Sequence, residues 1–364
     1  MKKVDPSRLY HIPVLSKALD VLELLQRGRQ SASLEDIHRQ TRISKSTIYR
    51  ILRTLEHRGY VAHLEDGNYR AVSGPSKLRF GFAGQSGQLP FSQAVTESLR
   101  EAAAASGIDL LILDNCYDAK VALENTARFV QEAVDVVIEF QIDQSVAPII
   151  SDHLARASIP LIAVEVPHPH GIFFGVDNFR VGFVAGEYLA QYAKREWRGK
   201  AKRVLGLDIQ EAGPLVQSRI TGAFEAIREV LPETPLQNYV RLDARGLRER
   251  SYKLSLEFLQ RHSEDRGIII VAADDTTALG ALRAVRELKR EKHVAIAGQD
   301  CLAEAMSEMQ RSRTPLVASV SHEVRTYGPR LIQLGLSLAR GQHVAPYHYV
   351  SHRLVTAEIV GSGV

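Results

Sequence analysis

Residues 44–58, SKSTIYRILRTLEHR, place polar and apolar side chains at helical spacing. Ile48, Ile51, Leu52 and Leu55 recur on one stripe, which predicts a helix with one buried face. The other face carries hydroxyl, phenol, amine and guanidinium groups, clustered toward its amino-terminal end: Ser44, Lys45, Ser46, Tyr49, Arg50 and Arg53. Such groups donate to base edges and phosphate oxygens, so the pattern indicates a helix that contacts DNA. A plain amphipathic surface helix would show the same stripe, so the neighbouring segments must decide.

The segments around this helix complete a small domain. Residues 15–28 repeat leucine on one helical stripe, and residues 33–41 begin with Ser33 and Asp36 at the spacing of a capping box. Residues 60–72 hold two short apolar runs around an Asp66-Gly67 turn of the hairpin type. The order helix, helix, helix, hairpin predicts a winged helix-turn-helix DNA-binding domain over residues 1–72.

The same residues resemble a known family. The runs ALDVLELL, SLEDIHRQTRISKSTIYRILRTLEHRGYV and NYR are similar to the winged amino-terminal domain of IclR-family transcriptional regulators, over about residues 15–72. The resemblance implies that the following residues face DNA: Lys45, Ser46, Thr47, Tyr49 and Arg50. It also implies that His63 and Arg70 lie near the flanking DNA backbone. Together with the polar face, it gives the predicted DNA-binding set Ser44, Lys45, Ser46, Thr47, Tyr49, Arg50, Arg53 and Arg70. Which of them reads a base stays open.

The charge distribution supports this assignment independently. Residues 1–76 hold 13 Lys and Arg against 8 Asp and Glu, and the other 288 residues hold 33 against 34. The basic excess is therefore confined to the segment predicted to bind a polyanion, as phosphate contacts require.

Length and composition limit the remaining possibilities. A chain of 364 residues with 45% hydrophobic residues can bury more than one core. It has no apolar run of membrane-spanning length, and MKKVDPSRLYHIP lacks the apolar centre of a secretory signal. Cys116 and Cys301 are far apart in the sequence and are interpreted as reduced thiols. We therefore expect a cytoplasmic protein without a membrane partner.

Enzyme and metal motifs are missing from the sequence. GxSxG, GxxxxGK[ST], HExxH and the dinucleotide fingerprint GxGxxG do not occur. His168 and His170 are separated by Pro169 and have no third ligand nearby in the sequence. We predict no enzyme activity, no metal site and no cofactor.

Residues 77–364 alternate apolar runs with helical patterns, after a helix-breaking linker at residues 73–76. Runs such as VDVVIEF and GIIIVAA are apolar almost throughout, which is typical of parallel strands covered on both faces. The pattern predicts a doubly wound α/β domain in two lobes.

Polar residues follow many of these predicted strands. In open parallel sheets, ligands bind beyond the carboxyl ends of the strands. The residues that we select there are carboxylates, amides and one aromatic ring: Gln88, Phe91, Gln141, Glu165, Asp177, Asp274 and Asp300. Such a set suits a polyhydroxylated ligand, because carboxylates and amides pair with hydroxyls and a ring can stack on a sugar face.

This segment also resembles a known fold. The runs LRFGFAGQSGQLPFSQAVTESLREAAAASG, IPLIAVE, GVDNFRVGFVAGEYLA, RITGAFEAI, DDTTALGALRAV, VAIAGQD and VASVSHEVRTYG are similar to the periplasmic sugar-binding-protein fold that LacI-family regulators use as effector domain. The resemblance implies two lobes joined by three crossings. We assign lobe 1 to about 77–178 and 302–321, and lobe 2 to about 179–301 and 322–364.

The resemblance also implies roles for single residues. Phe91 would stack on a sugar ring, and the other ligand-contacting positions would be Glu165, Arg219, Asp274, Asp300 and His322. Val166 stands where sugar binders often have Arg or Lys, and the LacI hinge motif is absent.

These inferences combine into one functional expectation. We expect a ligand-responsive transcriptional regulator, acting as a repressor, that binds operator DNA and a sugar-like effector as at least a homodimer on a near-palindromic site. The alternative is a DNA-tethered dimerisation module without a small-molecule ligand.

Overall fold

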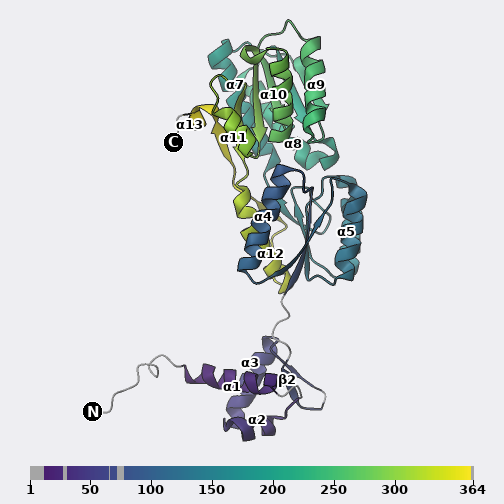
Figure 1. Ribbon diagram of the computed structural model, residues 1–364, viewed down its shortest axis with the longest axis vertical. Helices are drawn as coiled ribbons and strands as arrows, with labels where there is room; N and C mark the ends of the chain where they lie inside the picture. Colours follow the sequence, from purple (N-terminus) through teal and green to yellow (C-terminus); the bar gives the residue numbers. More distant parts are fainter. Residues whose placement is uncertain (1–11, 28–30, 65, 72–77, 362–364) are drawn as a thin grey trace, which may run out of the picture. The chain divides into compact units, whose positions relative to one another are not determined.

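The computed structural model describes residues 12–27, 31–64, 66–71 and 78–361. The chain folds into two compact units, Met1–Leu78 and Arg79–Val364 (Figure 1). The predicted linker at residues 73–76 lies outside the described residues. No described helix is both long and apolar enough to cross a bilayer.

The amino-terminal unit contains the predicted three helices and hairpin. Its elements are α1 (Pro13–Arg27), α2 (Leu34–Thr41), α3 (Lys45–His57), β1 (Val61–His63) and β2 (Tyr69–Ala71). The two strands are antiparallel, with Val61 opposite Ala71. The core includes Val21, Ile37, Ile48 and Leu52, each fully buried. The apolar stripe predicted for α3 is thus its buried face.

A local hydrogen-bond pattern sets the turn before α3. Ser33 and Asp36 form the predicted capping box at the start of α2. Arg42 ends that helix in the left-handed conformation, and the Nδ1 atom of His38 lies 2.6 Å from the carbonyl oxygen of Ile43. Ser44 then precedes α3 as its N-cap residue. These contacts fix the direction in which α3 leaves the turn.

The carboxy-terminal unit has two α/β lobes, each built around one sheet of described strands (Figure 1). The first sheet has the order β13-β7-β6-β5-β3-β4, and its pairs are parallel. Its strands are β3 (Arg79–Gly84), β4 (Asp109–Asp114), β5 (Val136–Glu139), β6 (Leu161–Val164), β7 (Ile172–Gly175) and β13 (Tyr347–Tyr349). The helices of this lobe are α4 (Pro90–Ala105), α5 (Ala119–Gln131), α6 (Ala147–Arg156) and α12 (Tyr327–Ala339).

The second sheet has the order β14-β12-β11-β10-β8-β9. Its strands are β8 (Arg203–Asp208), β9 (Tyr239–Asp243), β10 (Ile268–Ala272), β11 (Val294–Gln299), β12 (Leu316–Ser321) and β14 (Arg353–Thr356). They are parallel except at the edge, where β14 runs antiparallel to β12. The helices of this lobe are α7 (Asn178–Trp197), α8 (Gly213–Val230), α9 (Arg248–Arg261), α10 (Asp275–Glu287), α11 (Ala303–Met309) and α13 (Ala357–Gly361). The predicted doubly wound α/β class is confirmed.

The predicted assignment of residues 302–349 to the lobes is wrong, whereas β14 and α13 lie in the second lobe as predicted. Residues 302–321 belong to the second lobe, because the buried strand β12 pairs with β11. Residues 327–349 belong to the first lobe, because α12 packs on α4 and β13 pairs with β7. Gly328 and Gly335 permit this packing, since a Cβ atom there would overlap Ser98 and Phe80. Within residues 78–361 the chain crosses between lobes after β7, after β12 and after β13, as the resemblance implied.

Candidate functional sites

A cavity in the carboxy-terminal unit is lined by residues from both lobes. Its lining includes most of the predicted ligand-binding residues: Phe91, Glu165, Arg219, Asp274, Asp300 and His322. Its volume is about 70 Å³, several times the minimum that holds one water molecule. The cavity therefore suits a small molecule.

The strand ends bring these side chains together. Glu165 follows β6 in the first lobe, while Asp274 and Asp300 follow β10 and β11 in the second. Glu165 has φ 62° and Asp300 has φ 97°, in the left-handed region that residues other than glycine rarely adopt. Such strained backbone persists where the surrounding structure imposes it, and it is common at functional sites.

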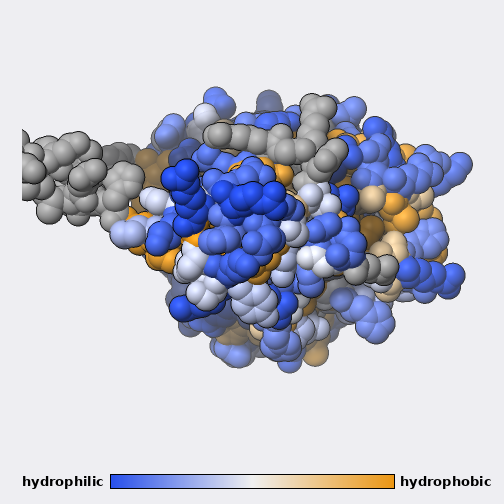
Figure 2. Space-filling view, turned by 90° about the horizontal axis from the view of Figure 1, so that it is seen from below, coloured by the Kyte–Doolittle hydropathy of each residue, from blue (hydrophilic) through white to orange (hydrophobic). Residues whose placement is uncertain are grey.

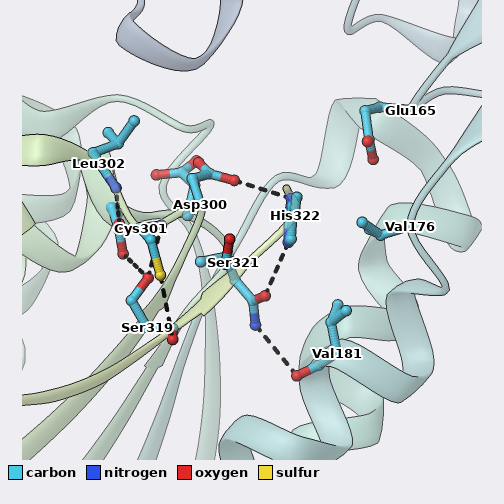
Figure 3. A network of polar contacts seen from close by, with 12 residues as sticks. Glu165, Val176, Val181, Asp300, Cys301, Leu302, Ser319, Ser321 and His322 are labelled. Carbon is cyan, nitrogen blue, oxygen red and sulfur yellow. Dashed lines mark hydrogen bonds and ion pairs between the residues drawn. The ribbon is translucent and has the colours of Figure 1, made fainter. Parts of the chain in front are cut away.

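Asp300 and His322 form a buried polar contact (Figure 3). The Nδ1 atom of His322 lies 3.2 Å from a carboxylate oxygen of Asp300, and both side chains are almost fully buried. On its other side, the Nε2 atom of His322 lies 3.2 Å from the Oε1 atom of Gln299. Burial lowers the pKa of His322 well below its usual range. Burial likewise raises the pKa of Asp300 well above its usual range, and the nearby carboxylates of Asp275 and Asp274 add to that shift.

Arg219 is the guanidinium of the cavity and is held by its neighbours. Its Nε donates to the Oδ1 atom of Asn178 at 2.9 Å, and its Nη1 donates to the carbonyl oxygen of Ala273. Gly182 of α7 allows α8 to approach closely, because a Cβ atom there would overlap the Arg219 backbone. The remaining nitrogen, Nη2, lies 3.9 Å from the Oε2 atom of Glu165. Arg219 therefore also makes an ion pair between the lobes.

Glu165 carries an unfilled hydrogen-bonding position. Tyr327 donates its hydroxyl to the Oε1 atom of Glu165. The Oε2 atom is buried and has no hydrogen-bond partner among the described residues. Burial raises the pKa of this carboxyl, and Arg219, the Tyr327 hydroxyl and the Val176 backbone partly offset the shift. A ligand donor in the cavity would satisfy this oxygen.

Phe91 supplies an aromatic surface at the start of α4. Its ring makes edge contacts with Phe140, His322 and Tyr327 at centroid distances of 6.1, 5.9 and 5.8 Å. These contacts fix the orientation of the ring. Such a ring suits stacking on the carbon face of a small polyol.

Three predicted ligand residues lie elsewhere. Gln88 is exposed and lies outside the cavity lining. Gln141 lines a neighbouring cavity, where its side chain contacts His168. Asp177 is exposed and caps α7 by accepting from the amide of Arg180 at 3.0 Å. Val166, which stands where sugar binders often have Arg or Lys, is fully buried and does not line the cavity.

Other lining residues were not in the predicted set: Gln85, Leu89, Tyr117, Phe140, Ile142, Ile209, Val216, Gly246 and Thr276. Gln85 directly follows β3, so the strand-end rule points to it as well as to Gln88. Tyr117 donates its hydroxyl to the carbonyl oxygen of Arg245, from the loop after β4 to the loop after β9. This is a hydrogen bond between the lobes at the cavity.

The predicted DNA-binding residues lie on the surface of the amino-terminal unit. Thr47 is half-buried, and the others are exposed: Ser44, Lys45, Ser46, Tyr49, Arg50, Arg53 and Arg70. Lys45 pairs with Glu35 of α2, and Arg53 pairs with Glu56 at 2.9 Å. The side chains of Arg50 and Arg70 make no hydrogen bond or ion pair with another described residue, which leaves them available to phosphate or bases. In Figure 2 the side chains of this unit that face the viewer are mainly hydrophilic.

Family comparisons match both units. Residues 14–65 match the IclR helix-turn-helix domain, and residues 80–343 match the periplasmic binding protein domain. The resemblances inferred from the sequence are therefore confirmed. These domains are those of a DNA-binding regulator and a solute-binding fold, which are generally not enzymes.

Solved structures with the same fold cover the second unit. An ABC transporter solute binding protein from Bacillus halodurans C-125 with bound myo-inositol has a TM-score of 0.69 and 20% identity, covering 80% of this chain and 99% of its own. One from Actinobacillus succinogenes 130z with bound D-allose has a TM-score of 0.68 and 18% identity, covering 79% and 100%. One from Mycobacterium smegmatis with bound glycerol has a TM-score of 0.70 and 20% identity, covering 79% and 96%. No curated protein matches the chain in sequence.

Proposed function

The chain belongs to the periplasmic binding protein domain family, and on that premise we propose that it is a transcriptional regulator whose affinity for operator DNA responds to a small sugar-like ligand. The amino-terminal helix-turn-helix binds the operator. The carboxy-terminal unit binds the effector between its lobes. Binding acts as a switch only if the ligand prefers one arrangement of the lobes, because a ligand shifts an equilibrium through differential affinity.

The cavity is the observation that carries this proposal. It joins a fixed aromatic ring, a guanidinium and three carboxylates from both lobes in a space of small-molecule size. Glu165 in addition presents a buried oxygen without a hydrogen-bond partner among the described residues. A fold retained for dimerisation alone would gain nothing from burying these polar groups, since burial without partners is destabilising. The myo-inositol, D-allose and glycerol of the similar structures support a polyol as ligand.

We further propose that the protein is a repressor that binds a near-palindromic operator as a homodimer. The exposed polar face of α3 supports DNA contact, and paired heads on paired half-sites are the usual arrangement for this motif. Effector binding then weakens operator binding.

Two linked measurements test this function. A thermal-shift screen of sugars, polyols and nucleosides should identify a ligand that raises the melting temperature, because a ligand that binds the native state stabilises it by mass action. That ligand should then weaken binding to a DNA site selected from random sequence, measured by gel shift. Sequence-specific DNA binding without any stabilising ligand would favour the alternative, a DNA-tethered dimerisation module.

A further inference from the structure

The cavity carries an excess of acidic groups. Its lining includes the carboxyls of Glu165, Asp274 and Asp300, and Arg219 is the cation among its lining residues. His322 does not restore the balance, because burial lowers its pKa and favours the neutral imidazole. The rest of the lining is apolar or neutral. Anionic ligands such as sugar acids or sugar phosphates would meet repulsion here.

Arg219, the one arginine of the lining, already has partners for most of its nitrogen atoms. Two of its nitrogens donate to Asn178 and to the carbonyl of Ala273, and the third lies 3.9 Å from Glu165. Asp274 is partly compensated, because it caps α10 by accepting from the amide of Thr277 at 2.7 Å. Asp300 has its contact with neutral His322, and Glu165 keeps an oxygen without a hydrogen-bond partner among the described residues. Arg219 is therefore the one cation of the lining for three buried carboxyls, and Asp300 has no ion-pair partner among the described residues apart from neutral His322.

We propose that the effector is a small polyhydroxylated amine, and that Glu165 and Asp300 receive its ammonium group. This inference rests on the proposed sensing function and narrows the ligand class. An ammonium offers three donors and a positive charge, and it bonds to both carboxyls when the lobes close. The hydroxyls of the ligand pair with Arg219 and Asp274, and its carbon face contacts the ring of Phe91. A neutral polyol could pair with these carboxyls by hydrogen bonds but would bring no positive charge to them.

Matched ligand pairs test the ligand class in the wild-type full-length protein. The probes are D-glucosamine with D-glucose, D-galactosamine with D-galactose, and 1-amino-1-deoxy-D-glucitol with D-glucitol. N-acetyl-D-glucosamine keeps the amine position but removes its charge, and D-glucuronate reverses the charge. We expect at least one amine to bind about tenfold or more tightly than its neutral partner by calorimetry, as for charge-assisted hydrogen bonds. The acetylated and acidic probes should bind more weakly still.

The outcomes separate this inference from the proposed function. If neutral sugars bind as tightly as amines or more tightly, the ammonium assignment is overturned and sugar sensing stands. If no probe binds, both are rejected. If an amine binds but operator affinity does not change, the ligand class stands and the regulatory role falls.

Charge-removing variants test the two receiving carboxyls. Glu165→Gln and Asp300→Asn preserve shape and should reduce the preference for the amine about tenfold, while binding of the neutral partner stays equal or improves. Glu308→Gln is the matched control, because Glu308 is also a buried carboxyl, pairs with Arg286 and lies outside the cavity lining. It should keep the wild-type preference, and an equal loss in this control would reject the assignment.

A proton balance gives a readout that does not depend on the variants. Burial raises the pKa of both Glu165 and Asp300, which favours the protonated form of each carboxyl. An ammonium should displace that proton, so the binding heat should differ between phosphate and Tris buffers in the sense of proton release. Amine binding without proton release at any pH between about 5 and 8 would contradict its placement beside these carboxyls.

Discussion

Asp300 combines an uncommon backbone conformation with a buried carboxyl. It has φ 97° directly after β11, and its side chain is 7% exposed beside neutral His322. Neither feature stabilises the fold. Glycine would adopt this backbone conformation with less strain than aspartate, and a carboxylate is more stable in water than in a buried position. The proposed role of Asp300 in ligand binding would account for both features.

We predict that Asp300→Ala still binds operator DNA but no longer responds to the effector. Loss of a charged hydrogen-bonding partner in a buried site costs about 1.5–3 kcal/mol, a tenfold or larger loss of affinity. Calorimetry measures the ligand affinity, and gel shift measures the response. An effector midpoint equal to that of the wild type would remove Asp300 from the site.

The buried carboxyl of Glu139 should make the free energy of unfolding depend on pH. It ends β5 fully buried, accepts from the Nδ2 atom of Asn115 at 2.7 Å, and burial raises its pKa from 4.5 to about 8. The folded protein thus keeps a proton that the unfolded carboxyl loses, so this group reduces stability as pH rises from about 4.5 to 8. Glu139→Gln should match the wild type in urea unfolding at about pH 4.5 and be more stable at about pH 8. A stability difference independent of pH would show that the carboxyl is ionised in the fold.

The Arg50 side chain allows a test of how much α3 contributes to DNA binding. It is exposed on the face opposite Ile48 and Leu52, and it makes no ion pair with a described residue. We expect Arg50→Ala to weaken specific binding about tenfold or more and to lower the salt slope by about one, with the fold unchanged. Arg39→Ala on α2 is the matched control, since Arg39 pairs with Asp36 and lies outside the predicted set. Equal losses in both variants would indicate a general charge effect instead of a contact by α3.

Two loops, one from each lobe, contact each other beside the cavity. Cys116 and Tyr117 after β4 have left-handed φ values of 52° and 57°, and Arg245 and Gly246 after β9 have 55° and 67°. These conformations bring the Tyr117 hydroxyl to the Arg245 carbonyl. Gly246 leaves room for this, because a Cβ atom there would lie 3.3 Å from that hydroxyl oxygen and 3.2 Å from Asp274. The hydrogen bond stabilises this arrangement of the lobes.

We predict that Tyr117→Phe weakens effector binding about 2- to 10-fold, the range expected for one neutral hydrogen bond. The loss should lie mainly in the dissociation rate, measured by stopped flow, because the bond forms only when the loops meet. Tyr239→Phe is a matched control, since the hydroxyl of Tyr239 is buried without a hydrogen-bond partner among the described residues. Unchanged dissociation from the Tyr117 variant would exclude a role in holding the ligand.

The elements that sequence predicted well are those buried on both faces. β5 and β10 appear where VDVVIEF and GIIIVAA are apolar almost throughout, because both sides of each strand meet helices. β13, with sequence YHY, is a half-exposed edge strand and has no such pattern. The assignment of the last segments to lobes failed for a related reason. Which lobe a helix such as α12 joins depends on packing against α4, and alternation of strand and helix does not encode it.

The cavity residues likewise fall into two groups, those at strand ends, which the sequence predicts, and those whose position depends on loop conformation, which it does not. Glu165, Asp274 and Asp300 were predictable because the carboxyl ends of parallel strands meet at one edge of a sheet. Gln85 lines the cavity and Gln88 does not, because the direction of the loop after β3 depends on local hydrogen bonds that periodicity does not reveal, such as that from the Gln88 amide to the Ser86 hydroxyl at 3.2 Å. Tyr117 was missed because its orientation depends on left-handed backbone, which leaves no periodic signal in the sequence.

At the scale of the whole molecule, the chain divides into two units with separate cores. Val21, Ile37 and Leu52 belong to the core of the amino-terminal unit, while Leu205 and Ile270 belong to the second. Because the cores are separate, each unit should fold without the other, and regulation requires a coupling free energy between two distinct sites. Such coupling is reciprocal: if effector lowers operator affinity by some factor, operator lowers effector affinity by the same factor.

This reciprocity gives the last prediction. Effector affinity of the full chain should fall in the presence of saturating operator DNA, by the factor that gel shifts measure in the opposite direction, typically about 5- to 150-fold. A fragment of residues 79–364 should bind the effector with the affinity of the DNA-free chain and ignore the operator, because it contains the whole cavity. Calorimetry with and without DNA measures both. Equal effector affinities of the full chain in the two conditions would show that the units are not coupled, and the protein would then bind sugar and DNA independently.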